Sequence, residues 1–353
     1  MSARPQRHGT AIGRLSPTLL LPLLMGSVLA NGTALAESAS RISDVPIEPD
    51  YSGYERTAPL IELGPPFLAT GNIDPGFEIP TGAVWQPQFL IWGDLRTAFQ
   101  DFDNGGTHNR EWANRLNLFA QLRLAPTERI VASFRPLDED GDFTGQRFEP
   151  EDRSVDGVNL RVRTLYMEGE LGEIFPRLDP DDTRALDWGF AVGRQPVFIQ
   201  EGMLIDDNID ALGVVRNSIR IKGLSNTRVA ALYGWNQVHR DDNREDRGAQ
   251  LFGLFTEIDM SCCTVDIDLA YVDADAPTGD GYYGAISSVQ RFGHLATSFR
   301  LLHSEADGTD NAAVSSGTLL FAETSFVPTG THDNVYINGF LGVDEFASAA
   351  RAA

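Results

Sequence analysis

The chain has 353 residues, of which 28 are basic and 50 are acidic, giving a formal net charge of −22. This acidity argues against nucleic acid as a partner. The two cysteines, Cys262 and Cys263, are adjacent, which excludes a disulfide framework or a cysteine-based zinc site.

The N-terminal residues have the pattern of a secretory signal peptide. A basic region with Arg4, Arg7 and Arg14 precedes an apolar run over residues 17–29, and Ala34-Leu35-Ala36 is a small-residue cleavage site. The run is shorter than the roughly 20 residues that a spanning helix needs, which argues against an uncleaved anchor. We expect residues 1–36 to be a signal peptide cleaved after Ala36, and no later run is long enough for a transmembrane helix.

Residues 37–84 form a proline-rich segment, because seven prolines between Pro46 and Pro80 interrupt any long element. Apolar residues such as Tyr51, Tyr54 and Phe67 are available to dock on another surface. The sequence leaves two interpretations open: a mobile periplasmic linker, or a plug in the mouth of a barrel.

Residues 85–353 show apolar and polar residues in alternation over about thirteen segments, with short and long connections alternating between them. Segments of this kind are typical of an all-β, antiparallel transmembrane β-barrel, and the fold must close because lipid cannot pair an open edge. Bacterial barrels have even strand numbers, so we expect a C-terminally incomplete barrel with about 14–18 strands in the complete chain. A soluble sandwich or solenoid is the alternative, but it would not explain the alternating connections.

The stretch from Asp187 to Lys222 is central to this interpretation. Its first segment places Trp188, Phe190 and Val192 on one side. The second, over residues 215–222, is predicted to alternate between an apolar side and a polar side, the polar side being Arg216, Ser218, Arg220 and Lys222.

Arginines recur at the polar positions of the predicted strands. A cation facing lipid is costly, so we expect these side chains to face a water-filled lumen, where they would favour anions and form bidentate contacts with carboxylates or phosphates. The alternative is that Arg–Asp pairs across strands stiffen the barrel. The predicted pore-lining arginines are Arg96, Arg115, Arg123, Arg161, Arg163, Arg216 and Arg220.

Acidic residues gather in the predicted long loops, most densely over residues 137–157. The candidate calcium ligands, at positions 1, 3, 5 and 12 of the calcium-loop pattern, are Asp138, Asp140, Asp142 and Glu149. Position 6 is Phe143 where the sharp turn needs glycine. We therefore expect no dedicated cofactor, only calcium held loosely between these acids and lipopolysaccharide phosphates.

The central stretch also carries a motif: Gly193-Arg194-Gln195, then Gly202 and Asp206, then Ile209-Asp210-Ala211. This pattern resembles the alginate export family. The resemblance implies an outer-membrane barrel whose arginine-rich lumen passes a polyuronate chain, with Arg194 and Asp210 near the constriction. By alternation Arg194 falls on the side of Phe190 and Val192, so turning it inward would require a bulge before Pro196.

These observations predict a non-enzymatic porin-like channel in the bacterial outer membrane, through which anionic solutes such as uronate oligosaccharides, other organic acids or phosphate pass down their gradient. Expected partners are outer-membrane lipid, lipopolysaccharide and the barrel-assembly machinery. A structural or adhesive barrel with a plugged lumen and functional acidic loops is the alternative. A membrane-embedded hydrolase is disfavoured, because no Gly-x-Ser-x-Gly elbow accompanies His239 or His303.

Overall fold

The protein was examined as a computed structural model, which describes residues 60, 61, 63, 76–139, 141–181, 183–275 and 278–352. The chain divides into two units, Met1–Gly71 and Asn72–Ala353. The predicted signal peptide and most of the proline-rich segment 37–84 lie outside the described residues.

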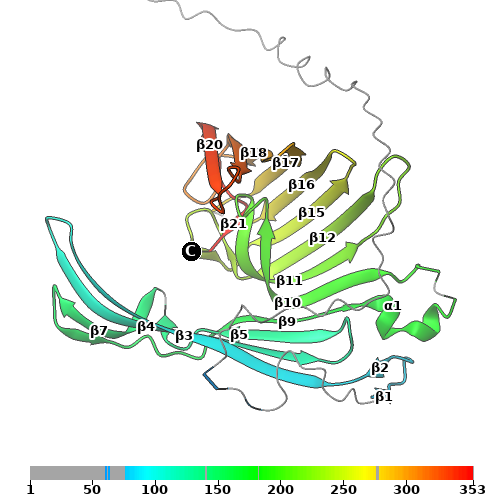
Figure 1. The fold of residues 1–353 in the computed structure, drawn as a ribbon, viewed down its shortest axis with the longest axis horizontal. Coiled ribbons are helices and arrows are strands. Elements are labelled where there is room, and N and C mark those ends of the chain that lie inside the picture. Colours follow the sequence, from blue (N-terminus) through cyan, green and yellow to red (C-terminus); the bar gives the residue numbers. More distant parts are fainter. Residues whose placement is uncertain are drawn as a thin grey trace, which may run out of the picture. The chain divides into compact units, whose positions relative to one another are not determined.

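The second unit is built on one antiparallel sheet (Figure 1), as the alternation predicts. In the part of the chain that the structure describes, no helix is both long and apolar enough to cross a membrane. The thirteen strands that follow one another through the sheet are β3 (Gln88–Asp103), β4 (His108–Arg123), β5 (Arg129–Phe134), β9 (Val162–Glu170), β10 (Trp188–Ile199), β11 (Ile205–Arg216), β12 (Asn226–Asn236), β15 (Gln250–Asp259), β16 (Cys263–Asp273), β17 (Gly281–Phe292), β18 (Leu295–Ala306), β19 (Gly317–Phe326) and β20 (Val335–Asp344).

The smaller elements lie at the ends of these strands. The helical turns α1 (Leu171–Ile174) and η1 (Pro176–Leu178) occupy the connection from β9 to β10. The other strands are β1 (Phe77–Glu78), β2 (Val84–Trp85), β6 (Asp138–Glu139), β7 (Asp142–Glu149), β8 (Arg153–Val155), β13 (Val238–His239), β14 (Glu245–Asp246) and β21 (Ala350–Arg351).

The sheet is open between its first and last long strands. Among the described residues, β3 pairs with β4 and β20 pairs with β19, and no pairing joins β3 to β20. With thirteen strands in antiparallel succession, β3 and β20 run in the same direction. The expected closed barrel is therefore not formed by these pairings, although its antiparallel, all-β character is present.

The central hairpin differs from the predicted one. Strands β10 and β11 pair continuously from Trp188 opposite Arg216 to Ile199 opposite Ile205. Their connection, residues 200–204, is short because Gln200, Glu201 and Gly202 all take positive φ angles. The predicted strand over residues 215–222 is wrong, since β11 ends at Arg216 and residues 217–225 form the connection to β12.

The acidic segment 137–157 is not a plain loop. It contains β6, β7 and β8, and β7 pairs with the N-terminal half of β4, from Arg110 opposite Glu149 to Asn114 opposite Thr144. Its acids are therefore partly strand residues. A cross-strand arginine offsets part of this acidity, because Arg110 of β4 lies 3.5 Å from Glu149 of β7.

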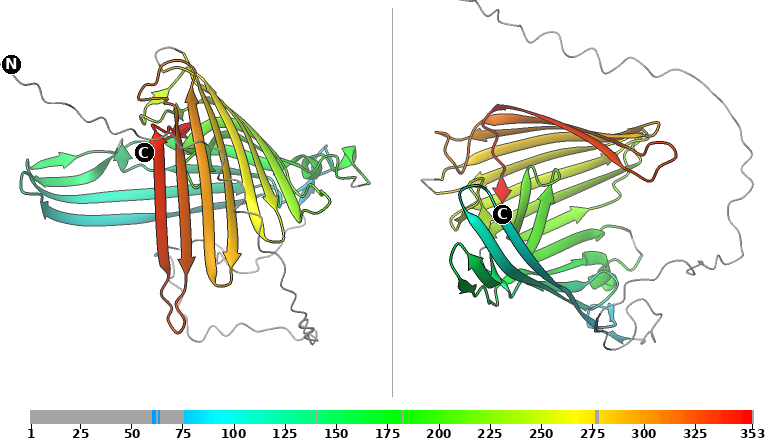
Figure 2. Two further views of the ribbon diagram at one scale, coloured as in Figure 1. Left: turned by 90° about the horizontal axis from the view of Figure 1, so that it is seen from above. Right: turned by 60° about the vertical axis from the view of Figure 1, so that its left-hand side comes forward.

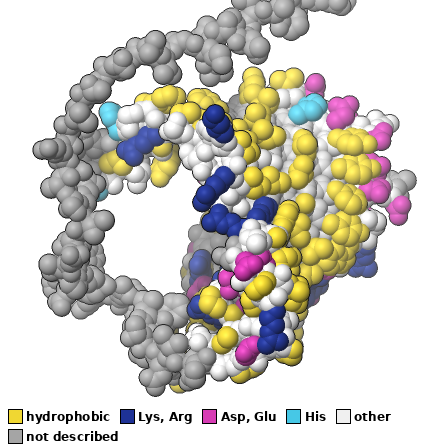
Figure 3. All heavy atoms as spheres, turned by 90° about the vertical axis from the view of Figure 1, so that its right-hand side faces the viewer, with side chains coloured by type: hydrophobic (Ala, Val, Ile, Leu, Met, Phe, Trp, Pro, Cys, Tyr) yellow, Lys and Arg dark blue, Asp and Glu magenta, His cyan; other side chains and the backbone are white. Residues whose placement is uncertain are grey.

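The strand register separates two faces of the sheet. We call the face that carries Ile209, Leu251, Val272 and Leu302 the inner face, and the opposite one the outer face. The outer face is mostly apolar and exposed, with hydrophobic side chains spread across it (Figure 3). A row of four aromatic residues crosses it on adjacent strands, with ring centroids 5.2, 6.2 and 4.8 Å apart in succession: Tyr233, Phe252, Tyr271 and Tyr282.

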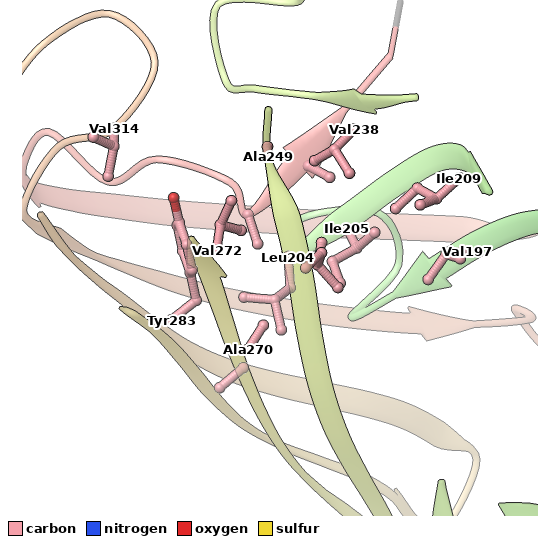
Figure 4. Close-up of a cluster of buried hydrophobic side chains, with 14 of the residues drawn as sticks. Val197, Leu204, Ile205, Ile209, Val238, Ala249, Ala270, Val272, Tyr283 and Val314 are labelled. Atoms are coloured by element: carbon pink, nitrogen blue, oxygen red, sulfur yellow. The ribbon is translucent and has the colours of Figure 1, made fainter. Parts of the chain in front are cut away.

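The inner face between β10 and β19 is filled at one end. The turn 200–204 and residues 347–350 lie against it, and β21 pairs in parallel with the start of β11 (Figures 2 and 4). The backbone N–H of Ala349 donates to the carbonyl of Leu204 at 2.9 Å. Leu204, Val272 and Leu302 are fully buried in the resulting core, so this region packs like a protein interior.

Candidate functional site: the charged inner face

The inner face of β3 and β4 carries three of the predicted arginines. Arg96 and Arg115 lie directly opposite each other across the two strands, and Arg123 lies on the same face of β4. Arg96 forms an ion pair with Asp94 at 2.8 Å. Like charges in direct opposition repel, and the single carboxylate of Asp94 faces both cations.

A second group of cations continues this row towards β9. Arg135, just after β5, has a pKa below its ordinary value, first because of burial and then because of the positive charges of Arg163 and Arg115. Asp138, at 3.8 Å, is its ion-pair partner. Within the described chain, no carboxylate lies within 4.0 Å of Arg115 or Arg163; Arg115 donates instead to the Asn117 side chain at 3.3 Å. Arg115, Arg135 and Arg163 therefore form a cation cluster with little compensation, an arrangement that attracts anions.

Nearer the other end of these strands the inner face borders a cavity of about 790 Å³. Arg123 and Arg129 face each other across β4 and β5, and Arg129 pairs with Glu168 at 2.5 Å. Gln195 of β10 also lines the cavity. This part of the wall is polar and retains one cation, Arg123, that has no ion-pair partner among the described carboxylates.

The inner face of β12–β18 is charged too, and on it Arg228 and Arg300 each contact an acid. Arg228 contacts Glu257 at 2.7 Å across β12 and β15. The turn 200–204 reaches the opposite strands, where the Gln200 amide donates to Asp268 at 2.7 Å and Arg300 donates to Glu201 at 3.3 Å. These groups line a cavity of about 490 Å³, which the turn narrows.

Arg194 and Asp210 meet, but not on the inner face. Arg194 donates to both carboxylate oxygens of Asp210, at 2.8 and 3.0 Å, and Asn236 donates to the same carboxylate at 2.7 Å. No register shift occurs between β10 and β11, so the pair shares the outer face with Val192 and Leu212. The bulge that would turn Arg194 inward is absent from this pairing, and the two residues do not face Arg115 and Arg123.

The remaining predicted pore-lining arginines are spread over other positions. Arg161 precedes β9 and contacts Glu139 at 3.2 Å. Arg216 ends β11 on the outer face, with its guanidinium 5.6 Å from the Trp188 ring centre. Arg220 lies in the connection 217–225, because β11 ends earlier than predicted. None of these three belongs to the cation cluster.

The predicted calcium ligands do not form a wrapped loop. Asp138 and Asp142 belong to the β6–β7 hairpin, while Glu149 lies at the end of β7 beside His108 and Arg110, at 2.6 and 3.5 Å. Asp140 lies outside the described residues. In the described chain no group of three or more His, Cys, Asp or Glu side chains is arranged to hold a metal ion. Calcium binding by these residues therefore stays a prediction.

The predicted pore-lining arginines do not include Arg129 and Arg228, which lie on the inner face, or Arg135, which lies near Arg115 and Arg163. The alternation of polar and apolar residues that identified Arg123 could also have identified these three arginines from the sequence. The roles of Gln200 and Glu201 could not be identified in this way, because they depend on a turn that folds back across strands β16 and β18.

No protein-family model matches the chain, and no curated protein matches it.

Proposed function

We propose that this protein is an outer-membrane β-sheet channel that passes anionic solutes along its inner face without chemical conversion. The observation that carries the proposal is the cation cluster of Arg115, Arg135 and Arg163, in which Arg115 shares the inner face of β3 and β4 with Arg96 and Arg123. Unpaired guanidinium groups lower the electrostatic barrier for anions and bind carboxylates or phosphates in two-point contacts.

The outer face supports the membrane part of the proposal. Large apolar side chains such as Phe99, Leu254 and Phe299 are exposed there at 64, 47 and 51% of their surface. A soluble monomer rarely leaves so large an apolar area in water. The aromatic row from Tyr233 to Tyr282 resembles the girdles that barrels place at a membrane interface.

The solute class follows from the cluster and from the resemblance to the alginate export family. Uronate oligosaccharides, small organic acids and phosphate all carry the oxyanions that arginine recognises. The structural support for this choice is the cluster, because the Arg194–Asp210 pair of the resemblance lies on the outer face.

The test is conductance of the full-length protein in a planar bilayer under a salt gradient. We expect discrete steps and a reversal potential displaced towards the anion equilibrium potential. A protein that inserts, as judged by a heat-modifiable gel shift, but prefers cations would overturn the proposed selectivity.

The second candidate function is a structural or adhesive membrane protein with a plugged interior. The observation that favours it is the core formed by the turn 200–204 and residues 347–350 against the inner face, with Leu204 fully buried. Inserted protein without conductance steps would favour this function over the channel.

A further inference from the structure

Cys262 and Cys263 lie at the hairpin between β15 and β16, and their sulfur atoms are 3.1 Å apart. Cys262 is exposed, and Cys263 is partly exposed at the first position of β16. The hairpin fixes the pair, because the backbone N–H of Met260 donates to the carbonyl of Cys263 at 2.8 Å and Asp259 lies opposite Thr264. Two thiols are thus held together and accessible at a tight turn.

We infer that this pair is a vicinal dithiol that exchanges with disulfides and forms a reversible Cys262–Cys263 disulfide. A sulfur–sulfur bond is about 2.05 Å long, so the two atoms need to approach by only about 1 Å. The bond links neighbouring residues and cannot staple separate strands. Its chemistry is therefore that of an exchangeable redox pair.

The reaction balances with an external disulfide as oxidant. The thiolate of one cysteine attacks that disulfide, forming a mixed disulfide and releasing one thiol. The second cysteine then displaces the other half, so two protein thiols are oxidised to one disulfide and the external disulfide is reduced to two thiols. Adjacent Cα atoms are about 3.8 Å apart, closer than in ordinary cystines, which makes the bond easy to reduce again.

A soft-metal site fits the same sulfurs less well. The described residues offer no third His, Cys, Asp or Glu ligand grouped with the two thiols. The redox inference does not rest on the channel function, because it needs only an accessible turn.

The experiment treats the refolded full-length protein with oxidised glutathione, then with N-ethylmaleimide, and measures the intact mass. The wild type should lose two hydrogen atoms, retain no glutathione and take no maleimide, and dithiothreitol should restore both maleimide sites. The matched variants Cys262→Ser and Cys263→Ser should each retain one glutathione, because no second thiol can displace it.

Two outcomes would overturn the inference. In one, the wild type keeps glutathione adducts as the single variants do. In the other, it remains reactive towards maleimide at both cysteines after oxidation. The control is far-ultraviolet circular dichroism of the serine variants. We expect the wild-type spectrum, because neither cysteine is buried.

Discussion

The inner face before β10 and the inner face after it differ in whether their arginines have carboxylate partners. On the inner face of β3–β9, Arg115 and Arg163 lack carboxylate partners among the described residues, and Arg135 shares only Asp138 at 3.8 Å. On the inner face of β12–β18, Arg228 and Arg300 each contact an acid. The paired wall is also the packed one, where the turn 200–204 and residues 347–350 lie. One sheet thus combines a wall suited to attracting anions with a wall suited to cohesion.

The largest expected effect is on the free energy of unfolding, through the packed core. Leu204→Ala removes a fully buried side chain from the core and should lower the free energy of unfolding by about 2–5 kcal/mol, as large-to-small core changes do. Leu160→Ala is the matched control, because Leu160 is 87% exposed and its loss should change stability little. Urea unfolding followed by tryptophan fluorescence measures both, and equal midpoints for the two variants would contradict the packed core.

The second prediction concerns the contribution of the Arg194–Asp210 ion pair on the outer face to stability. Asp210→Asn breaks a two-point ion pair whose side chains are 26 and 18% exposed, so we expect a loss of about 1–3 kcal/mol. Glu257→Gln breaks the more exposed pair with Arg228, which should cost less than about 1 kcal/mol. The same urea unfolding assay compares the two variants. A larger loss of unfolding free energy for Glu257→Gln than for Asp210→Asn would contradict the prediction that the Arg194–Asp210 pair is the stronger one.

The third effect is a pH dependence of the free energy of unfolding, which arises from His239. The hydrogen bond that the His239 imidazole donates to Asp207 raises the pKa of His239, which lies in β13 outside the main sheet. The charged form is therefore favoured in the folded protein. Its contribution should be complete below the ordinary pKa of 6.5 and disappear as the pH rises through the raised value.

His239→Gln should remove this dependence while leaving stability above that range nearly unchanged. Urea midpoints across pH 5 to 9 measure it, a range set around the ordinary histidine pKa of about 6.5. A wild-type midpoint that rises with pH through this window would contradict the assigned direction.

The sequence was sufficient for the strand architecture because alternation is a local signal. The predicted count of about thirteen strands agrees with the long strands of the sheet, and Arg96, Arg115 and Arg123 share one face as predicted. The alternation was insufficient for β11, because Asp207 and Asp210 resemble loop residues until their partners are in place: His239 for Asp207, and Arg194 and Asn236 for Asp210.

Tertiary contacts account for the other differences. The acidic segment 137–157 pairs with β4, where Arg110 contacts Glu149 across the two strands. The inward fold of Gln200 depends on Asp268, far away in the sequence. Alternation carries no information on either contact, nor on which segments fill an inner face.

The measurement that tests the contrast between the walls most directly is the reversal potential of the triple variant Arg115→Gln, Arg135→Gln, Arg163→Gln under a salt gradient. We expect it to move from the anion side towards zero or beyond, because two cations without carboxylate partners among the described residues are gone, together with Arg135, whose partner Asp138 is 3.8 Å away. The control is Arg228→Gln with Glu257→Gln, which removes a paired cation and its acid without changing net charge and should leave the potential unchanged. Equal shifts for the two variants, or none for the triple variant, would contradict the account.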